Sequence, residues 1–242
     1  MEQNTTIKTH ISVVIPVLNE LEIINATIHH VRAVAGDIPV EIIVADGGDD
    51  HMTLNEISDA HVLKVESPPG RGCQMNAGAA LASGDILLFL HADTELPDGA
   101  LAAVASVLTE GAVAGAFRLS IDSPKPVYKV VAWFANLRSR LERVPYGDQA
   151  QFIRADIFRD LGGFAEIPIM EDVELFRRLR SKGLPIVLLP GRVKTSSRRW
   201  DNEGVLRRTL ANWWLRLRYR FGVSPETLAH HYRPHGYKAD DS

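Results

Sequence analysis

The sequence predicts an α/β protein with a Rossmann-like, mostly parallel central sheet flanked by helices, and a helical extension at the C-terminus. Three observations predict it. β-Branched runs alternate with segments whose apolar residues recur at helical spacing, which is typical of parallel strands joined by crossover helices. The run 85–90 is almost wholly apolar, as expected of a strand buried on both faces. Acidic residues follow two of the predicted strands, where α/β sheets place ligand sites.

The order of the elements follows from these patterns. Ile11–Val17 is rich in Val and Ile, and the apolar residues of segment 20–35 recur at helical spacing. Segment 40–45 repeats the β-branched pattern. We expect strands at 11–17, 40–45, 60–65, 85–90 and 113–121, and helices at 20–35, 73–82, 97–108, 127–141 and 203–221, with a short helix after residue 50.

Charge is unevenly distributed along the 242 residues, whose net charge is −3. Residues 1–176 hold 12 Lys and Arg against 25 Asp and Glu, whereas residues 177–242 hold 15 against 5. The acidic part suits a divalent cation, and the basic part suits phosphate or anionic lipid. The alternative is that the acidic and basic parts pair electrostatically with each other within one fold. A nucleic-acid partner is not expected, because the acidic part opposes the approach of a duplex.

Cysteine use and hydropathy indicate a cytoplasmic protein. Cys73 is the single cysteine, so no internal disulfide can form, and the N-terminus lacks a basic region followed by an apolar run. No apolar stretch approaches the roughly 20 residues that cross a bilayer. Membrane contact, if any, would be peripheral and at the inner face.

Three acidic segments carry the candidate chemistry. Asp46-Gly-Gly follows a Val-rich strand, and its glycines allow a ligand to approach the backbone closely; a plain Asp-Gly turn is the alternative. In an extended His91-Ala-Asp93, both side chains would point to one side and could reach one Mg²⁺ or Mn²⁺ together with substrate phosphates. Alternatively, Asp93 caps a turn and His91 only packs. Glu171 and Asp172 begin a helix. One of the two carboxylates could be a fixed general base, or both could only interact favourably with the helix dipole.

Together these segments resemble glycosyltransferase family 2. Five motifs occur in that family's order: Val13-Val-Ile-Pro-Val-Leu-Asn-Glu20, Asp46-Gly-Gly-Asp49, Arg71-Gly-x-x-x-Asn76-x-Gly78, His91-Ala-Asp93 and Glu171-Asp172. Tyr146-Gly-Asp-Gln149, Leu161-Gly-Gly-Phe164 and Arg198-Arg-Trp200 are similar to a small soluble bacterial subgroup described as associated with radical-SAM proteins.

The resemblance implies a nucleotide-diphosphate-sugar transferase fold and an inverting glycosyltransferase of the hexosyltransferase class. Mn²⁺ or Mg²⁺, held by Asp93 with His91, would neutralise the leaving diphosphate. Many family members have Asp at the position of His91, so a direct bond from His91 to the metal stays open, as does the identity of the metal. The implied nucleotide-binding residues are Pro16, Val17, Leu18, Asn19, Glu20, Asp46, Gly47, Arg71, Asn76 and Ala92.

The acceptor side follows from the same resemblance. Asp172 would take the proton of the acceptor hydroxyl, with Glu171 as the neighbouring alternative. Residues around the donor sugar and acceptor would be Tyr146, Gly147, Asp148, Gln149, Arg198, Arg199 and Trp200. A surface loop anchored by Trp200 and a polar turn at 146–149 are the alternatives. Ser196 stands where processive synthases have Gln, so a non-processive enzyme is expected.

The expected organisation is a catalytic domain at 1–200, with a nucleotide-binding half at about 1–95 and an acceptor half at about 96–200. An amphipathic helix and tail at 201–242 would pack on it, through an apolar stripe that is core, a subunit contact or a membrane contact. The donor is expected to be a UDP-sugar, the acceptor a hydroxyl compound of unknown identity, and an oligomer is left open. A nucleotidyltransferase and a non-catalytic nucleotide- or partner-binding module are the alternative functions.

Overall fold

The computed structural model describes residues 9–230, apart from the side chains of Arg199, Asn202, Glu203 and Leu206. The first half contains β1 (Ile11–Val17), α1 (Ile24–Val34), β2 (Val40–Asp46), α2 (Met52–Glu56), β3 (Val62–Glu66), α3 (Arg71–Leu81), β4 (Ile86–Phe89), β5 (Thr94–Glu95) and α4 (Ala100–Thr109). The second contains β6 (Ala114–Asp122), α5 (Pro126–Glu142), the 3₁₀ turn Gly147–Gln149, β7 (Gln151–Arg154), α6 (Ala155–Asp160), α7 (Glu171–Ser181), β8 (Ile186–Ser196), α8 (Arg198–Glu203), α9 (Val205–Arg220) and α10 (Pro225–Ala229).

The strands form one mixed sheet in the order β3-β2-β1-β4-β7-β6-β8-β5. Strands β3, β2, β1 and β4 pair in parallel, and β8 pairs in parallel with β6. β7 runs antiparallel to both β4 and β6, and β5 runs antiparallel to β8. The mostly parallel, Rossmann-like sheet is therefore confirmed, with β7 and β5 as its reversed strands. The carboxyl ends of the parallel strands share one edge, where ligand sites form.

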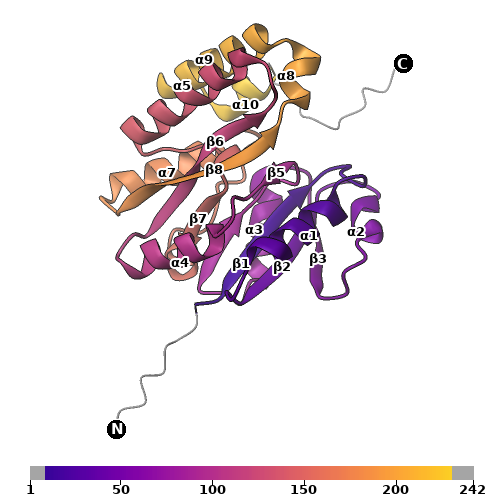
Figure 1. Ribbon diagram of the computed structural model, residues 1–242. Coiled ribbons are helices and arrows are strands. Elements are labelled where there is room, and N and C mark those ends of the chain that lie inside the picture. Colours follow the sequence, from indigo (N-terminus) through magenta and orange to yellow (C-terminus); the bar gives the residue numbers. More distant parts are fainter. Residues whose placement is uncertain (1–8, 231–242) are drawn as a thin grey trace.

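Helices cover both faces of this sheet (Figure 1). One apolar cluster joins the sheet to α1, α4 and α5, and a second joins it to α3, α6 and α7. A smaller cluster of Ile169, Leu215 and Leu228 holds α9 and α10 against the loop before α7. Figure 1 shows α5 and α9 side by side at the end of the molecule opposite β3, and the two helices are in contact. Residues 1–8 and 231–242 lie outside the described part.

Three of the expected helices differ most from the observed ones. Helix α1 begins at Ile24 rather than at residue 20, because residues 21–23 form a turn in which the N–H groups of Ile23 and Ile24 donate to the carbonyl of Glu20. Helix α4 begins only after Gly99, which has a φ of 69°. Gly204, with a φ of 84°, divides the expected helix 203–221 into α8 and α9. The apolar stripe predicted for α9 lies largely exposed rather than in the core, since Trp213, Trp214 and Leu217 retain about half of their accessible surface.

Candidate active site

Asp46 lies at the carboxyl end of β2 and is 1% exposed. Its Oδ1 accepts a hydrogen bond from the N–H of Gly48 at 2.8 Å, so the Asp-Gly-Gly segment is a tight turn as well as a candidate ligand site. Its Oδ2 is buried and has no hydrogen-bond partner among the described residues. A buried carboxylate oxygen without a partner carries a desolvation cost that a donor group on a ligand would remove.

Gln74 fixes the ends of the two neighbouring strands and is a residue that the motifs did not single out. Its Nε2 donates to the carbonyl of Val17 at 2.5 Å and to that of Ala45 at 3.2 Å, and so ties β1 to β2. A methyl group added at Gly47 would lie 2.9 Å from Cδ of Gln74. Gly47 is therefore required for the close approach of α3 to this turn.

The His91–Asp93 segment is a turn between β4 and β5, so the expectation of an extended segment was wrong. The N–H of Thr94 donates to the carbonyl of His91 at 3.1 Å, and the carbonyl of Asp93 accepts from the N–H of Ser196 at 3.1 Å. The short strand β5 pairs with β8, which forces the chain to turn directly after β4. The carbonyl of Ala92 is taken by the Oγ1 of Thr27 at 2.5 Å.

The imidazole of His91 lies against the Tyr146–Gln149 turn. A methyl group added at Gly147 would be 3.0 Å from Nε2 of His91 and 3.5 Å from Oδ2 of Asp172. The N–H of Gly147 donates to that same Oδ2 at 2.6 Å. The fold therefore brings together β4, the 3₁₀ turn and the start of α7, which are far apart in the sequence.

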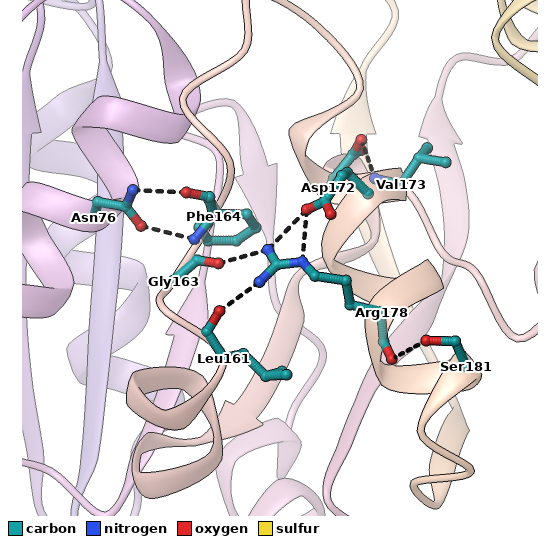
Figure 2. Close-up of polar contacts among 9 residues, drawn as sticks. Asn76, Leu161, Gly163, Phe164, Asp172, Val173, Arg178 and Ser181 are labelled. Carbon is teal, nitrogen blue, oxygen red and sulfur yellow. Dashed lines mark hydrogen bonds and ion pairs between the residues drawn. The ribbon is translucent and has the colours of Figure 1, made fainter. Parts of the chain in front are cut away.

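Asp172 is held at the beginning of α7 by two backbone donors, Gly147 N–H on Oδ2 and Val173 N–H on Oδ1 at 2.6 Å. Burial raises its pKa, and these two donors, with Arg71 and Arg138, oppose that rise. Figure 2 shows the carboxylate of Asp172 turned toward the N–H of Val173, at the beginning of its own helix. Met170, the residue directly before α7, has a φ of 70°, a left-handed backbone conformation that is costly for a non-glycine residue and is often found at functional sites.

Glu171 and Asp148 complete a compact acidic group. Glu171 is 5% exposed, and burial together with the charge of Asp172 raises its pKa to about 7. Burial raises the pKa of Asp148 to about 6, and the charges of Asp172 and Asp93 add to this, while Arg138 and Arg71 oppose it. Strongly shifted carboxyl groups of this kind cluster at functional sites. The guanidinium of Arg71 acts on all three carboxyl groups and is exposed.

Glu20 and Arg198 bound the site on the side of β1. Arg198 reaches Glu20 with a nitrogen–oxygen distance of 3.7 Å. Burial raises the pKa of Glu20, the charge of Asp93 adds to the rise, and Arg198 and Arg71 lower it. Asp93 and Arg198 are thus both close enough to act on Glu20, as a shared site requires. The side chain of Arg199 lies outside the described part of the chain.

Arg138 is a site residue that no motif indicated. It projects from α5 with its guanidinium carbon 3.6 Å from the ring centroid of Tyr146, a cation–π distance. On the other side, Arg216 of α9 donates to the hydroxyl of Tyr146 at 3.3 Å. Because arginines of this kind lie in ordinary amphipathic helices, the sequence alone offers no signal for either role.

The structure gives Asn76 a different role from the nucleotide contact expected of it. Its Nδ2 donates to the carbonyl of Phe164 and its Oδ1 accepts from the N–H of Phe164, both at 2.9 Å (Figure 2). Arg178 holds the same loop from the other side, donating to the carbonyls of Leu161 and Gly163 at 2.6 Å (Figure 2). Both halves of the Asn76 amide are therefore used to fix the Leu161–Phe164 loop.

Gln149 and Trp200 also carry structural contacts. The fully buried amide of Gln149 accepts from Ser139 Oγ at 2.7 Å and donates to the carbonyl of Phe117 at 2.9 Å, which anchors the 3₁₀ turn. Trp200 packs on the core with its ring 6.4 Å from that of Tyr128. The anchoring alternative is therefore the arrangement found for Trp200, and these contacts do not support sugar stacking by its indole.

A divalent metal fits this site only if a ligand completes its coordination shell. Among the described residues, no three His, Cys, Asp or Glu side chains lie close enough to hold a metal ion by themselves. Asp93 offers a half-exposed carboxylate, with Glu20 and Asp148 within electrostatic range. Oxygen donors of this kind suit Mg²⁺ or Mn²⁺, which usually bind through one or two carboxylates and substrate phosphates.

Comparison with known proteins identifies the fold and the family. The family model "Glycosyl transferase family 2" matches residues 12–165, more than half of the chain and most of the site just described. The chain belongs to glycosyl transferase family 2. This family match covers all of the site up to the Leu161–Phe164 loop, whereas Glu171, Asp172 and Arg198 lie beyond it.

One curated relative of this chain is the glucosyl-3-phosphoglycerate synthase of Mycolicibacterium smegmatis. The two sequences are 29% identical over 97 residues, a match that covers 36% of this chain and about a third (32%) of the relative's length.

Three solved structures have a fold similar to that of this chain. The glucosyl-3-phosphoglycerate synthase of Mycobacterium tuberculosis, in complex with Mn²⁺, uridine diphosphate and phosphoglyceric acid, matches with a TM-score of 0.59 and 23% identity, over 84% of this chain and 76% of that one. The mannosyltransferase PcManGT of Pyrobaculum calidifontis, in complex with GDP-Man and Mn²⁺, matches with a TM-score of 0.59 and 17% identity, over 95% and 66%. TarS of S. aureus, in complex with UDP-GlcNAc, matches with a TM-score of 0.56 and 16% identity, over 77% and 58%.

Proposed function

We propose that this protein is an inverting, metal-dependent, non-processive glycosyltransferase that moves a sugar from a nucleotide-diphosphate donor to a hydroxyl acceptor. The observation that carries the proposal is that Asp93, Asp172 and Arg71 all lie close enough to act on Asp148, while Asp46 ends the parallel strand β2. Membership of glycosyl transferase family 2 supports it. A uridine nucleotide is our expected donor, since two of the similar structures hold uridine compounds.

The donor nucleotide would lie across the ends of β1 and β2. The unpartnered oxygen of Asp46 is suited to accept a hydrogen bond from the base or ribose, and the turn that follows it is held in place where Gly47 packs against Gln74. Arg71 and Arg198 are permanently charged and can bind diphosphate oxygens as planar donors. Asp93 would hold Mn²⁺ or Mg²⁺, which when bound neutralises charge on the diphosphate leaving group.

Asp172 is the proposed general base. Its carboxylate would accept the proton of the acceptor hydroxyl while that oxygen forms a bond to the anomeric carbon and the bond from this carbon to the diphosphate breaks. Attack from the face opposite the leaving group inverts the configuration. The backbone donors from Gly147 and Val173 fix the orientation of the carboxylate, which proton transfer requires. Glu171 is almost fully buried, so it is the weaker candidate for contact with an acceptor.

Two variants separate donor binding from chemistry. With UDP, GDP, dTDP and CDP, each with and without Mn²⁺ or Mg²⁺, we expect one nucleotide with metal to raise the melting temperature, because ligand that binds the native state stabilises it. Asp93→Asn should lose this rise. Asp172→Asn should keep it but release the nucleoside diphosphate from the matching donor sugar about 100-fold or more slowly, the range of general-base catalysis.

Asp156→Asn is the matched control, since Asp156 is an exposed carboxylate at the opposite end of the sheet. It should retain both binding and turnover. If no nucleotide with metal stabilises the wild type, a nucleotide-sugar site is excluded and a non-catalytic module is favoured. Transfer of a nucleotidyl group instead of a sugar would favour a nucleotidyltransferase, although the segment after β1, Leu18-Asn19-Glu20, lacks the expected glycine-rich phosphate loop.

Several finer assignments remain predictions of the same proposal. They are the division into a catalytic domain at 1–200 and a C-terminal extension, the cytoplasmic location, and membership of the subgroup associated with radical-SAM proteins. The acceptor is assigned only as a hydroxyl compound. The Tyr146–Gln149 turn is our candidate for its binding surface, because this turn lies between Asp172 and the helices α5 and α9.

A further inference from the structure

Helices α5 and α9 together carry an exposed aromatic and aliphatic surface, which we call the α5–α9 face. On α5 the exposed apolar residues recur at spacings of three and four, and on α9 they do the same. The rings of Trp133 and Phe134 are 4.8 Å apart, and those of Phe134 and Trp213 are 6.1 Å apart, so the two stripes join. The face consists of Val127, Val130, Trp133, Phe134, Leu137 and Leu141 on α5, and Leu210, Trp213, Trp214, Leu217 and Phe221 on or directly after α9.

The outward orientation of this face is fixed because the opposite sides of α5 and α9 pack against the rest of the protein. Tyr128 and Ala132 of α5 are buried in the main core, and Leu215 of α9 is buried against Ile169 and Leu228. The outward residues remain accessible, with Trp133 and Trp213 each 58% exposed and Phe221 78% exposed. Contiguous apolar surfaces of this kind on a protein exterior mark contact with a membrane or with another protein.

The charges beside this face select the partner. Helices α5 and α9 contain eight Lys and Arg residues and one acidic residue, Glu142, which forms an ion pair with Arg216. Lys129, Arg140, Arg207 and Arg220 are exposed. A second copy of the chain would bring two such basic surfaces together, which is unfavourable. An anionic lipid surface complements both the basic rim and the apolar centre.

We infer that the α5–α9 face binds the surface of an anionic phospholipid bilayer, with its aromatic side chains inserted at the level of the headgroups. Within residues 9–230, no helix has the length and apolar composition needed to cross a bilayer, so the contact would be interfacial. Trp side chains suit this depth because they present an apolar ring and a polar N–H. This inference rests on the face alone and does not depend on the proposed sugar transfer.

The face lies directly behind the candidate acceptor side. Arg216 points inward from α9, where it pairs with Glu142 and donates to the hydroxyl of Tyr146. The same helix that would lie on the bilayer therefore contacts the Tyr146–Gln149 turn. Docking would hold this turn at a fixed, short distance from the membrane surface.

Co-sedimentation of the full chain with vesicles tests the inference. We expect binding to vesicles of phosphatidylcholine with phosphatidylglycerol, weaker binding to phosphatidylcholine alone, and loss of binding as salt is raised. Trp133→Gln combined with Trp213→Gln should weaken binding on the order of tenfold or more, given the burial of two large apolar side chains. The matched control is Met52→Gln with Leu81→Gln, which alters two comparably exposed apolar residues on α2 and α3 and should bind as the wild type does.

A second pair of variants tests the charges. Arg207→Gln with Arg220→Gln should weaken binding to the anionic vesicles, whereas Arg154→Gln with Arg159→Gln, which changes two exposed arginines distant from this face, should not. The inference is overturned if the wild type does not bind anionic vesicles or if the Trp133/Trp213 variant binds them equally well. It is also overturned if sedimentation velocity without lipid shows a dimer that this variant dissociates, because the face would then bind a second copy.

Discussion

The backbone N–H of Gly147 lies 2.6 Å from Oδ2 of Asp172 and joins the 3₁₀ turn after α5 to the first turn of α7. This bond orients the carboxylate that we propose as the general base and draws it toward the imidazole of His91. The preference for glycine follows from the same contact. A side chain at this position would meet both the imidazole and the carboxylate, so backbone and catalytic geometry depend on one another here.

Gly147→Ala should lower turnover by roughly tenfold while leaving the fold intact. The added methyl group would lie 3.0 Å from Nε2 of His91, so the imidazole must shift by a few tenths of an ångström, and it would touch Oδ2 of Asp172 at 3.5 Å. Small displacements of catalytic groups have large effects on rate. Donor turnover and melting temperature are the measurements. Gly191→Ala, whose methyl group would lie 3.2 Å from Cγ of Pro97, imposes similar crowding away from the site and should keep its turnover.

Asn76→Ala should destabilise the protein by about 1–3 kcal/mol, because both the N–H and the carbonyl of Phe164 lose their partners. Urea unfolding measures the change in the free energy of unfolding. The structural role assigned to this amide also predicts that nucleotide affinity changes little under conditions where the variant is folded. Asn55→Ala, an exposed amide on α2, should have an effect within about 0.5 kcal/mol. A stable Asn76→Ala variant with weakened nucleotide binding would restore the role first expected of this residue.

Arg71→Gln should move the acidic limb of the pH–rate profile to higher pH. The guanidinium of Arg71 lowers the pKa values of Asp148, Glu171 and Asp172, so its loss lets all three bind protons more tightly. The general base would then lose its proton only at higher pH, with a displacement of up to about one pH unit. Arg71→Lys keeps the charge and should retain the position of the limb. An unchanged limb in Arg71→Gln would show that Arg71 does not act on the base.

The fold was largely predictable because its strands and helices follow local patterns. Strand β1 has the predicted bounds, β4 and α5 differ from theirs by one residue at each end, and β2 differs by one residue at its C-terminal end. Strands β7 and β8, like the two-residue β5, were missed for physical reasons. The four residues of β7, Gln151–Arg154, become a strand through pairing with β4 and β6, which no local pattern records. In β8, Pro190 and Gly191 interrupt the apolar run, and the sheet accommodates them through a register shift opposite Phe117 and Arg118.

In the candidate site, too, local features could be predicted from the sequence, whereas contacts between distant residues could not. Carboxylates at strand ends were found from the sequence because their position relative to a strand is local. The contacts of Asn76 and Gln149 with distant backbone groups were not, since an amide in a motif looks the same whether it binds a ligand or a loop. The outward stripe of α9 is a further case. Apolar spacing reveals an amphipathic helix, but which side meets the core depends on neighbours such as Ile169 and Leu228.

Glu171→Gln should raise the stability of the folded protein at alkaline pH and have little effect near pH 5. Burial and the charge of Asp172 raise the pKa of Glu171 from 4.5 to about 7 in the folded state. Between these two values the folded state binds more protons than the unfolded state, so the free energy of unfolding falls as pH rises. The stabilising contribution of the neutral acid is thus fully present below about pH 4.5 and is lost as pH rises through about 7.

A neutral glutamine cannot ionise and removes this loss. Melting temperatures of the wild type and of Glu171→Gln should therefore diverge from pH 5 to pH 8, with the variant higher at pH 8. Glu56→Gln, an exposed glutamate on α2, should show no such divergence. A difference between wild type and Glu171→Gln that is constant across this range would mean that Glu171 is ionised throughout. The buried pair would then hold two charges, and Glu171 would have to be considered alongside Asp172 as the base.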